Sequence, residues 1–403
     1  MNNIYQPNLY RIASPLHDGE ELRKSFQIFI NQIETIGEFT FNNHGTCFDE
    51  YDASKLNIIF VQTGGTENQF KELMNKITGP VYLLAQDTNN SLAATIEILT
   101  YLKQNHHQGE IISGDVKDIA TQISDLIALK RAHFTLKGSR LGLIGEPSDW
   151  LISSHVDEQA LIHMFGIEIV KISIEELIVE INKEYSTELP FAIKTSDNQT
   201  AFSKACNIYM AIRHLIEKYH LEAVTIRCFD LLGTIKNTSC LALAILNSEG
   251  YVATCEGDIA TAITMMILSV LTNCPGFQAN PSSLNKREKT MIFAHCTVPL
   301  KMVASYTYDT HFESKLGVAI VGTLDEGPAT IFKLASNLKD YYVSEGVILP
   351  HDLISQLCRT QVKLKVQDDD LNYFLTKPLG NHHVIVNGRY KDRILSFLKS
   401  YLV

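Results

Sequence analysis

Short apolar runs alternate with helical patterns through the first part of the chain, and this alternation limits the fold more than any other feature. Residues 56–62 and 81–85 are apolar runs of strand length, and residues 68–77 and 91–102 carry apolar residues at helical spacing. Strands that alternate with helices are typical of βαβ units, which assemble into parallel sheets. The sequence therefore predicts an α/β domain over residues 1–137.

A second series of the same kind begins after that boundary. It alternates strand-like and helix-like segments, at residues 140–144, 156–165, 168–172, 200–220 and 223–228. The pattern predicts a second α/β domain over residues 138–275, similar in build to the first.

The sequence pattern changes near residue 276, after which most segments are strand-like. They lie at residues 290–294, 318–321, 329–334, 361–366 and 383–386, and an amphipathic helix at 391–401 follows them. Such a series favours antiparallel pairing. The predicted fold class is two successive Rossmann-like α/β domains followed by a mainly antiparallel β domain over residues 276–403 with a closing helix.

Composition excludes several classes of protein. The chain has 403 residues and a formal net charge of −10, which argues against a nucleic-acid partner, because phosphate contacts need clustered Lys and Arg. Its longest apolar stretch, residues 259–271, is shorter than the ~18 residues of a membrane span. Residues 1–15 show no signal-peptide pattern. The eight cysteines form no C-x-x-C pair and predict reduced thiols in a cytoplasmic protein with no membrane partner.

Each α/β series contains a glycine turn that resembles a phosphate cradle. The two turns read QTGGTEN at residues 62–68 and LIGEPSD at residues 143–149. Neither contains G-x-G-x-x-G or G-x-x-x-x-G-K-[ST]. We therefore interpret both as plain connections between a strand and a helix.

Residues 241–280 hold the first candidate for chemistry. The apolar run at 241–246 predicts a strand, a second strand is expected at 251–255, and a helix is expected from Ile259 onward. Glu256 then follows the carboxyl end of a strand, where open α/β sheets place their ligands. An acidic residue in the first turn of a helix is also favoured by the helix dipole alone, and Asp258 fits that explanation better than Glu256.

Histidines in the last third supply the second candidate. His295 stands at the end of a predicted strand, His311 lies in THFES at 310–314, and His382 and His383 form a pair in GNHHV. Each of them alone is explained equally well as a core or surface residue. Taken together with a carboxylate and an amide, they are ligand types that suit a Mn²⁺-like ion.

These segments resemble a known superfamily. CLALAILNSEGYVATCEGD at 240–258, THFESKLGVAIVGTL at 310–324 and GNHHVIVNGRY at 380–390 are similar to segments of the L-fucose isomerase and L-arabinose isomerase superfamily. The resemblance covers the order of the domains, but its specific motifs lie in the second half of the chain. It does not identify the sugar.

The resemblance implies a set of metal ligands. In the fucose isomerase branch, a Glu, an Asp about 24 residues later and a late His bind Mn²⁺; the matching positions here are Glu256, Asn280 and His382. The Asn departs from that pattern, because an amide offers a carbonyl oxygen to a metal but is not a general base. The arabinose branch has a His pair at the late position, which keeps His383 possible, and a ligand His that matches His295.

The chemistry implied is aldose–ketose isomerisation, with Mn²⁺ or another divalent cation stabilising an enediolate. Glu256 is then both ligand and base, or a second group assists it. Asp230 is the candidate for that second group, although a solvated acid in a loop would explain the residue without any function. A metal-activated water is the other candidate for the base. His295, His311, Asn280 and His383 are the expected sugar contacts.

Two alternatives remain open at this stage: a non-catalytic sugar-binding or regulatory protein, and a sugar epimerase. The expected partner in each case is a small-molecule sugar. By resemblance, the chain is also expected to form a homo-oligomer, a trimer or hexamer.

Overall fold

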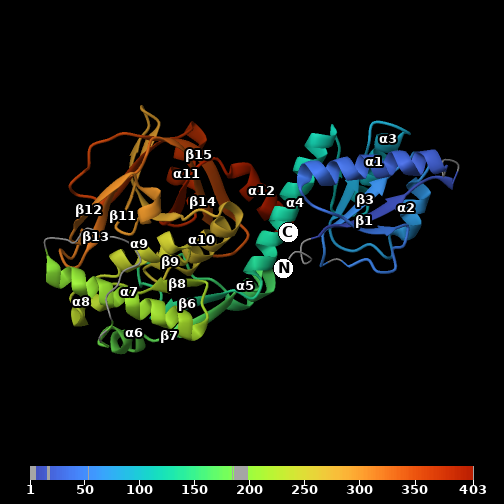
Figure 1. Cartoon of the computed structure of the whole chain (residues 1–403). Helices are drawn as coiled ribbons and strands as arrows, with labels where there is room; N and C mark the ends of the chain where they lie inside the picture. The colour runs from blue at the N-terminus through green and yellow to red at the C-terminus, as the bar shows by residue number, and fades with distance from the viewer. Residues whose placement is uncertain (1–5, 16–18, 53, 184, 186–197, 403) are drawn as a thin grey trace. The chain divides into compact units, whose positions relative to one another are not determined.

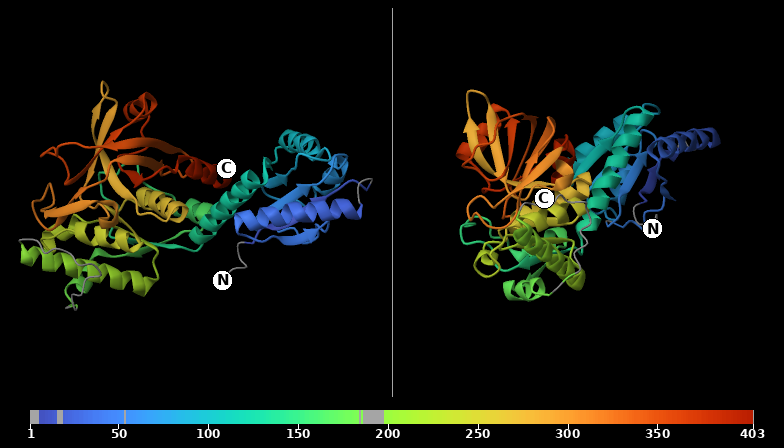
Figure 2. Two further views of the ribbon diagram at one scale, coloured as in Figure 1. Left: turned by 45° about the horizontal axis from the view of Figure 1, so that its top comes forward. Right: turned by 60° about the vertical axis from the view of Figure 1, so that its left-hand side comes forward.

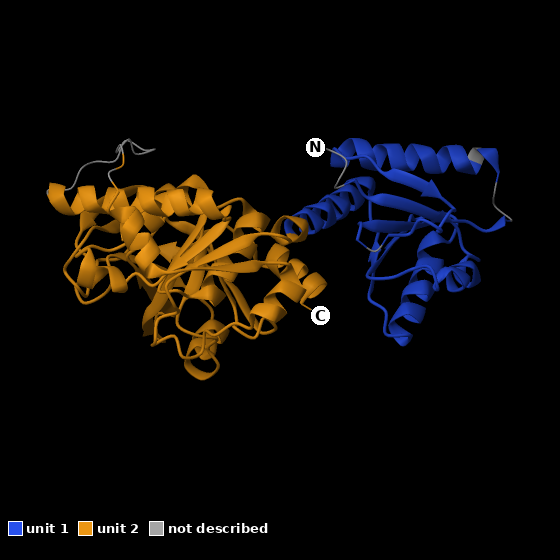
Figure 3. Ribbon diagram, turned by 90° about the horizontal axis from the view of Figure 1, so that it is seen from below, with its two compact units in different colours: residues 1–132 blue, residues 133–403 orange. Residues whose placement is uncertain are grey.

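A computed structural model of the chain describes residues 6–15, 19–52, 54–183, 185 and 198–402. The chain divides into two compact units, residues 1–132 and residues 133–403, which Figure 3 colours separately. Each unit is described by itself below.

The first unit is built on a five-stranded sheet in the order β2-β1-β3-β4-β5, and every pairing in it is parallel. Its strands are β1 (Asn8–Ile12), β2 (Asn42–Gly45), β3 (Asn57–Val61), β4 (Val81–Leu84) and β5 (Gly109–Ile112). Its helices are α1 (Glu20–Gly37), α2 (Glu67–Leu73), α3 (Ser91–Gln104) and α4 (Val116–Leu136), the last of which continues into the second unit.

Helices cover both faces of this sheet. Side chains alternate between the faces along each strand, so that Ile58 packs with the apolar residues of α1 and α4, whereas Ile59 packs with those of α2 and α3. A strand buried on both faces has to be apolar throughout, which explains the continuous apolar run at β3.

The second unit begins with a four-stranded parallel sheet in the order β7-β6-β8-β9. Its strands are β6 (Arg140–Ile144), β7 (Glu168–Ile172), β8 (Ala223–Ile226) and β9 (Val252–Cys255). Its helices are α5 (Glu158–Phe165), α6 (Ile174–Ile181), α7 (Gln199–Tyr219), α8 (Asp230–Thr234), α9 (Cys240–Glu249) and α10 (Ile259–Thr272). Figures 1 and 2 show α10 between this sheet and the strands that follow it in the chain.

Those later strands form a closed antiparallel barrel in the order β10-β11-β16-β15-β14-β17, beside a two-stranded sheet of β12 and β13. The barrel strands are β10 (Phe277–Asn285), β11 (Thr290–His295), β14 (Gly327–Leu334), β15 (Tyr341–Leu349), β16 (Thr360–Lys365) and β17 (His383–Asn387). The remaining elements are the short helix η2 (Leu300–Met302), the strands β12 (Ser305–Asp309) and β13 (Ala319–Thr323), and the helices α11 (Asp368–Thr376) and α12 (Lys391–Tyr401).

The prediction of parallel sheets followed by an antiparallel region is confirmed. The first unit ends close to the predicted boundary at 137, and the predicted domains 138–275 and 276–403 lie together in the second unit. None of the helices in the described part of the chain is long and apolar enough to cross a membrane. All eight cysteines are free thiols, and five of them are buried.

One predicted element is wrong: residues 241–246 are not a strand but the middle of helix α9. Every residue of α9 from Cys240 to Ser248 is buried, so the helix has no polar face to reveal its period. Its Asn247 side chain bonds both the N–H and the C=O of Ala253, which fastens the helix to β9. A buried helix therefore stands where the sequence predicted a strand.

Candidate active site

Glu256 follows the last residue of β9 in a tightly held turn. Its φ of 69° is left-handed, a conformation that is uncommon for a residue other than glycine and that often occurs at functional sites. The N–H of Ser148 donates to its carbonyl at 2.9 Å, and the next N–H, that of Gly257, donates to Ile226 at 3.0 Å. A Cβ on Gly257 would lie 2.6 Å from the carbonyl oxygen of Glu146, so only glycine fits there.

The Glu256 side chain meets two histidines brought from the barrel. Its Oε1 lies 3.7 Å from Nε2 of His295 at the end of β11 and 3.5 Å from Nε2 of His382, just before β17. One ligand atom from each of the three residues lies within 4.8 Å of the others, and all three residues are buried. The structure therefore brings together three residues that the sequence selected, in an arrangement that could hold a metal ion.

The two oxygens of the Glu256 carboxylate have different neighbours. Oε1 faces the histidines, whereas Oε2 accepts a hydrogen bond of 2.6 Å from the indole N–H of Trp150. Trp150 packs edge-on against Phe229 and is half exposed. The Trp150 side of the carboxylate is therefore the side nearer to solvent.

Each of the two histidines is held in turn by a hydrogen bond to its other ring nitrogen. The His295 Nδ1 is 2.9 Å from the hydroxyl of Thr297. The His382 Nδ1 is 2.8 Å from Oδ2 of Asp258, and the other oxygen of that carboxylate, Oδ1, caps helix α10 by accepting the N–H of Thr261. The Nε2 of His382 is buried and has no hydrogen-bond partner in the part of the chain described. A buried nitrogen without a partner is the feature expected of a ligand aimed at an ion.

Charge at the site is dominated by ionised carboxylates. Burial opposes ionisation of Glu256, but the neighbouring His295 and His382, whose Nε2 atoms lie 3.7 and 3.5 Å from Oε1, outweigh it and hold the pKa of Glu256 well below its ordinary value. Burial is likewise outweighed at Asp258, where Lys333 and His382 lower the pKa of the carboxyl. For His382, burial disfavours the cation, yet Asp258 and Glu256 raise its pKa to about 9. An ion that binds here therefore has to displace a proton from His382.

Asn280 lies on β10, the strand that pairs with β11 and β17. It stands opposite Ala294 in the β10–β11 ladder, and its Oδ1 accepts a hydrogen bond of 3.2 Å from Asn381. The neighbouring Gln278 bonds both the N–H and the C=O of Cys255, which joins this strand to the end of β9. Asn280 thus lies on the same strand as Gln278, whose side chain fixes the backbone directly before Glu256.

The other predicted residues have different surroundings. His383 is fully buried, with Nε2 2.9 Å from the Tyr373 hydroxyl and Nδ1 3.1 Å from the carbonyl of Asn381, and burial lowers its pKa to about 3. His311 packs edge-on against Phe229. Asp230, in the first turn of α8, pairs with Arg227 at 3.2 Å. None of these three contributes to the group of possible ligands formed by described residues.

Sequence reasoning missed the partners rather than the candidate ligands. The helix dipole explains Asp258 in the sequence, and no sequence pattern singles out Trp150 or Lys333. Trp150 is 106 residues from its carboxylate partner, and Asp258 is 124 residues from His382. The only available signal was the LIGEPSD turn, which directly precedes Trp150.

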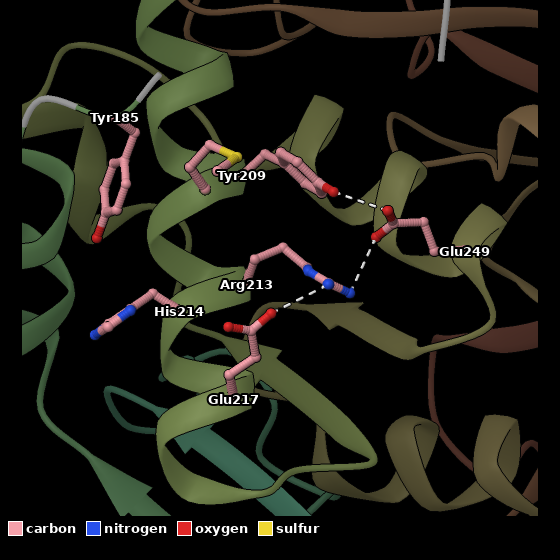
Figure 4. Close-up of a pocket in the computed structure, with 7 residues that line it drawn as sticks. Tyr185, Tyr209, Arg213, His214, Glu217 and Glu249 are labelled. Atoms are coloured by element: carbon pink, nitrogen blue, oxygen red, sulfur yellow. Dashed lines mark hydrogen bonds and ion pairs between the residues drawn. The ribbon is translucent and has the colours of Figure 1, made fainter. Parts of the chain in front are cut away.

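A separate hollow of about 310 Å³ lies along α7. Figure 4 shows Arg213 between Glu217 and Glu249, and the hydroxyl of Tyr209 donates to Glu249 at 2.8 Å. Oε2 of Glu249 makes no hydrogen bond to a described residue and lies 3.6 Å from the Arg213 guanidinium, and none of these residues is a site residue predicted from the sequence.

Comparisons with known proteins agree with the resemblance of the segment around Glu256. Residues 156–274 match the family model of the L-arabinose isomerase central domain. The sulfoquinovose isomerase of Priestia aryabhattai is 24% identical over 326 residues, which cover 76% of this chain and 73% of that protein. The sulfoquinovose isomerase of Clostridium sp. (strain MSTE9) is 25% identical over 263 residues, which cover 59% and 58%. The L-arabinose isomerase 2 of Clostridium acetobutylicum is 25% identical over 171 residues, which cover 39% and 35%. By these similarities, the chain resembles sugar isomerases of the arabinose isomerase type.

Proposed function

We propose that the chain is a metal-dependent ketol isomerase, which interconverts an aldose and its ketose through an enediolate. The observation that carries the proposal is the convergence of Glu256, His295 and His382 from three separate strand ends, with a buried Nε2 of His382 that no described residue satisfies. The relatives with isomerase names support the same class of reaction.

The donor set fits a divalent ion such as Mn²⁺. One carboxylate and two imidazoles would bind it, and the amide oxygen of Asn280 is our proposed fourth donor. When bound, such an ion polarises the sugar carbonyl and stabilises the negative charge of the enediolate. The fucose isomerase subtype has no support beyond the sequence motifs, so the arabinose-like branch is the one proposed.

The residues of the chain divide the remaining work. With an amide at position 280, Glu256 is the carboxylate that moves the proton between C1 and C2 of the sugar. Its Oε2, on the Trp150 side, is the oxygen placed for that transfer, while its Oε1 faces the histidines. Asp230 is ion-paired with Arg227 at 3.2 Å and is not part of the cluster of possible ligands, which leaves the role to Glu256.

Sulfoquinovose is the first substrate to test, because that name belongs to the relatives that cover most of this chain. Purified protein with Mn²⁺ should convert sulfoquinovose, or else L-arabinose or L-fucose, into the ketose. In deuterated water, NMR should show deuterium entering at C1 of the ketose and, through the reverse reaction, at C2 of the aldose, and a chelator should stop both changes. Protein that binds Mn²⁺ but shows neither product nor exchange with any of these sugars would contradict the proposal.

One observation favours a second function. Asn280 removes an acid that the fucose branch uses, and a protein that lost this acid could still bind a sugar without converting it. Such a binder would show sugar-dependent thermal stabilisation but no exchange of deuterium. An Asn280→Asp variant tests the role of the amide. Activity gained on fucose or arabinose means that the Asn tunes the substrate, and activity lost means that the Asn is part of the mechanism. An epimerase would instead exchange deuterium without forming a ketose.

A further inference from the structure

A chain of buried hydrogen bonds leads from His382 to a lysine inside the barrel. The Lys333 ammonium donates to the Thr261 hydroxyl at 3.1 Å, and that hydroxyl donates to Oδ2 of Asp258 at 2.7 Å. The same Oδ2 lies 2.8 Å from Nδ1 of His382. We call these four residues, Lys333, Thr261, Asp258 and His382, the Lys333 chain.

The Lys333 chain is costly to bury and joins three distant parts of the second unit. Lys333 is 1% exposed, and the other three residues are completely buried. Lys333 lies on β14, Asp258 and Thr261 lie at the start of α10, and His382 precedes β17. Apolar residues of similar volume usually give equal or greater stability than a buried ion pair. The fold alone therefore does not explain why the charges are there.

The geometry fixes which nitrogen of His382 can face a cation. An ionised carboxylate accepts hydrogen bonds only, so the Nδ1 next to Asp258 has to carry a proton. The lone pair of a neutral His382 is then on Nε2, which points toward Glu256 and His295. A carboxylate behind a ligating histidine is a common way to fix the ring and raise its basicity.

We propose that Asp258, Thr261 and Lys333 are positioning residues, which hold His382 in the tautomer and orientation that bind the metal ion. Asp258 acts on the ring directly. Thr261 acts on Asp258 by donating its hydroxyl hydrogen to Oδ2, and Lys333 acts through Thr261, because its ammonium donates to that same hydroxyl and orients it. This inference rests on the proposed metal site and assigns that site a second layer.

The first test compares two threonines on one helix. Thr261→Val removes the hydroxyl of the Lys333 chain, while the backbone N–H of residue 261 still reaches Oδ1 of Asp258. Thr264→Val is the matched control: Thr264 is also fully buried, and its hydroxyl accepts from the backbone N–H of Leu334, next to Lys333. We expect a weaker Mn²⁺ affinity for Thr261→Val, by about threefold to tenfold, and a change below about twofold for Thr264→Val.

The second test changes the carboxylate. In Asp258→Asn, Oδ1 can still cap α10, but the amide then presents an N–H to Nδ1 of His382. That donor stabilises the tautomer with the proton on Nε2, where the ion would bind. The Mn²⁺ affinity, followed by the loss of the free-ion EPR signal, should fall by roughly 10- to 100-fold.

The third test asks whether Lys333 acts through Asp258. Lys333→Met should weaken Mn²⁺ binding in the wild-type background but have little further effect when Asp258→Asn is present, because coupled residues are not additive. The visible spectrum of the Co²⁺-loaded protein supplies a readout that a purely structural role would not move. The melting temperature of each variant shows whether it folds.

The outcomes separate the two proposals. A wild-type protein that binds no divalent ion overturns the proposed function, and this inference with it. A wild-type protein that binds Mn²⁺ while Asp258→Asn and Thr261→Val bind it equally well overturns the inference alone. Equal losses in Thr261→Val and Thr264→Val also overturn it, because the effect would then come from helix packing.

Discussion

The two units of the molecule each contain a parallel sheet, but they bury different kinds of polar side chain. In the described residues of the first unit, the buried polar side chains are all neutral: Asn8, Ser14, Asn57, Gln62, Thr63, Thr66, Ser91 and Thr95. The second unit buries ionisable side chains: Glu180, Glu256, Asp258, Asp370, His295, His311, His382, His383 and Lys333. Because buried charge is expensive, its confinement to one unit indicates where the chemistry lies.

The turns that follow β3 in the first unit and β9 in the second show the difference in detail. After β3, the Thr63 hydroxyl accepts the N–H of Ser14, and the Thr66 hydroxyl donates to the Thr63 carbonyl. Those groups satisfy one another, as in an ordinary strand-to-helix connection. After β9, Glu256 turns its carboxylate toward histidines of the barrel instead. One architecture thus serves as a scaffold in one unit and as a site in the other.

The largest expected effect comes from neutralising the acid after β9. Glu256→Gln keeps the shape of the side chain but removes both the base and the anionic ligand, so turnover should fall by about 1000-fold or more. Glu67→Gln is the counterpart after β3, in the first turn of α2, and should retain wild-type activity. Steady-state assays of both variants check this contrast, and unchanged activity in Glu256→Gln would falsify the assignment of the base.

Metal binding should stabilise one unit and not the other. A ligand present at 100 times its dissociation constant stabilises the native state by about 2.7 kcal/mol, which slows exchange through the corresponding opening by about 100-fold. Mn²⁺ should therefore protect β9, β11 and β17, the strands that lead to the three donors, while β1, β3 and β4 keep their exchange rates. Hydrogen exchange with mass spectrometry measures both sets in one sample. Equal protection of both units would show that the ion does not bind at the Glu256 cluster specifically.

The fold was predictable wherever an element presents a clear boundary or period. The strands β6 and β7 and the helix α12 lie at the residues expected from the sequence. The helix α9 was not predictable, because its residues are buried all round and so show no helical period. Short apolar runs of this kind fit a buried strand equally well, and only the packing decides between them.

The individual residues of the site could be predicted from the sequence, but the contacts between them and their neighbours could not. Glu256 follows from the rule that ligands lie beyond the carboxyl ends of parallel strands, and His295 and His382 follow from the resemblance. The contacts of Trp150 and Lys333 depend on how the loop after β6 and the strand β14 pack against the start of α10. In the sequence, Lys333 is a single lysine in a mainly apolar strand, and nothing marks it as buried.

A smaller effect is expected at the Trp150 side of Glu256. Trp150→Phe keeps an aromatic ring beside Phe229 but removes the N–H that holds Oε2. A hydrogen bond to a charged group contributes about 1.5 kcal/mol or more, so kcat should fall by about tenfold. Ile152→Ala is the control on the same loop, because this side chain is 92% exposed, and it should leave kcat unchanged. If both variants lose activity alike, the loop as a whole is responsible rather than the indole N–H.

The smallest effect at neutral pH is expected in the first unit, at Tyr51. Burial raises the pKa of Tyr51 to about 12, and its hydroxyl has no hydrogen-bond partner among the described residues. In the unfolded chain this group ionises near pH 10. Between pH 10 and 12 the folded state therefore holds more protons than the unfolded state, and the free energy of unfolding falls as the pH rises, by about 2 kcal/mol in total. Tyr51→Phe should change stability by less than about 1 kcal/mol at pH 7 and should lose less stability over that alkaline range. Urea unfolding at a series of pH values measures this, with Tyr101→Phe, a partly exposed tyrosine on α3, as the control that should follow the wild-type profile. A Tyr51→Phe profile identical to that of the wild type would mean that Tyr51 ionises as freely in the folded unit as in the unfolded chain.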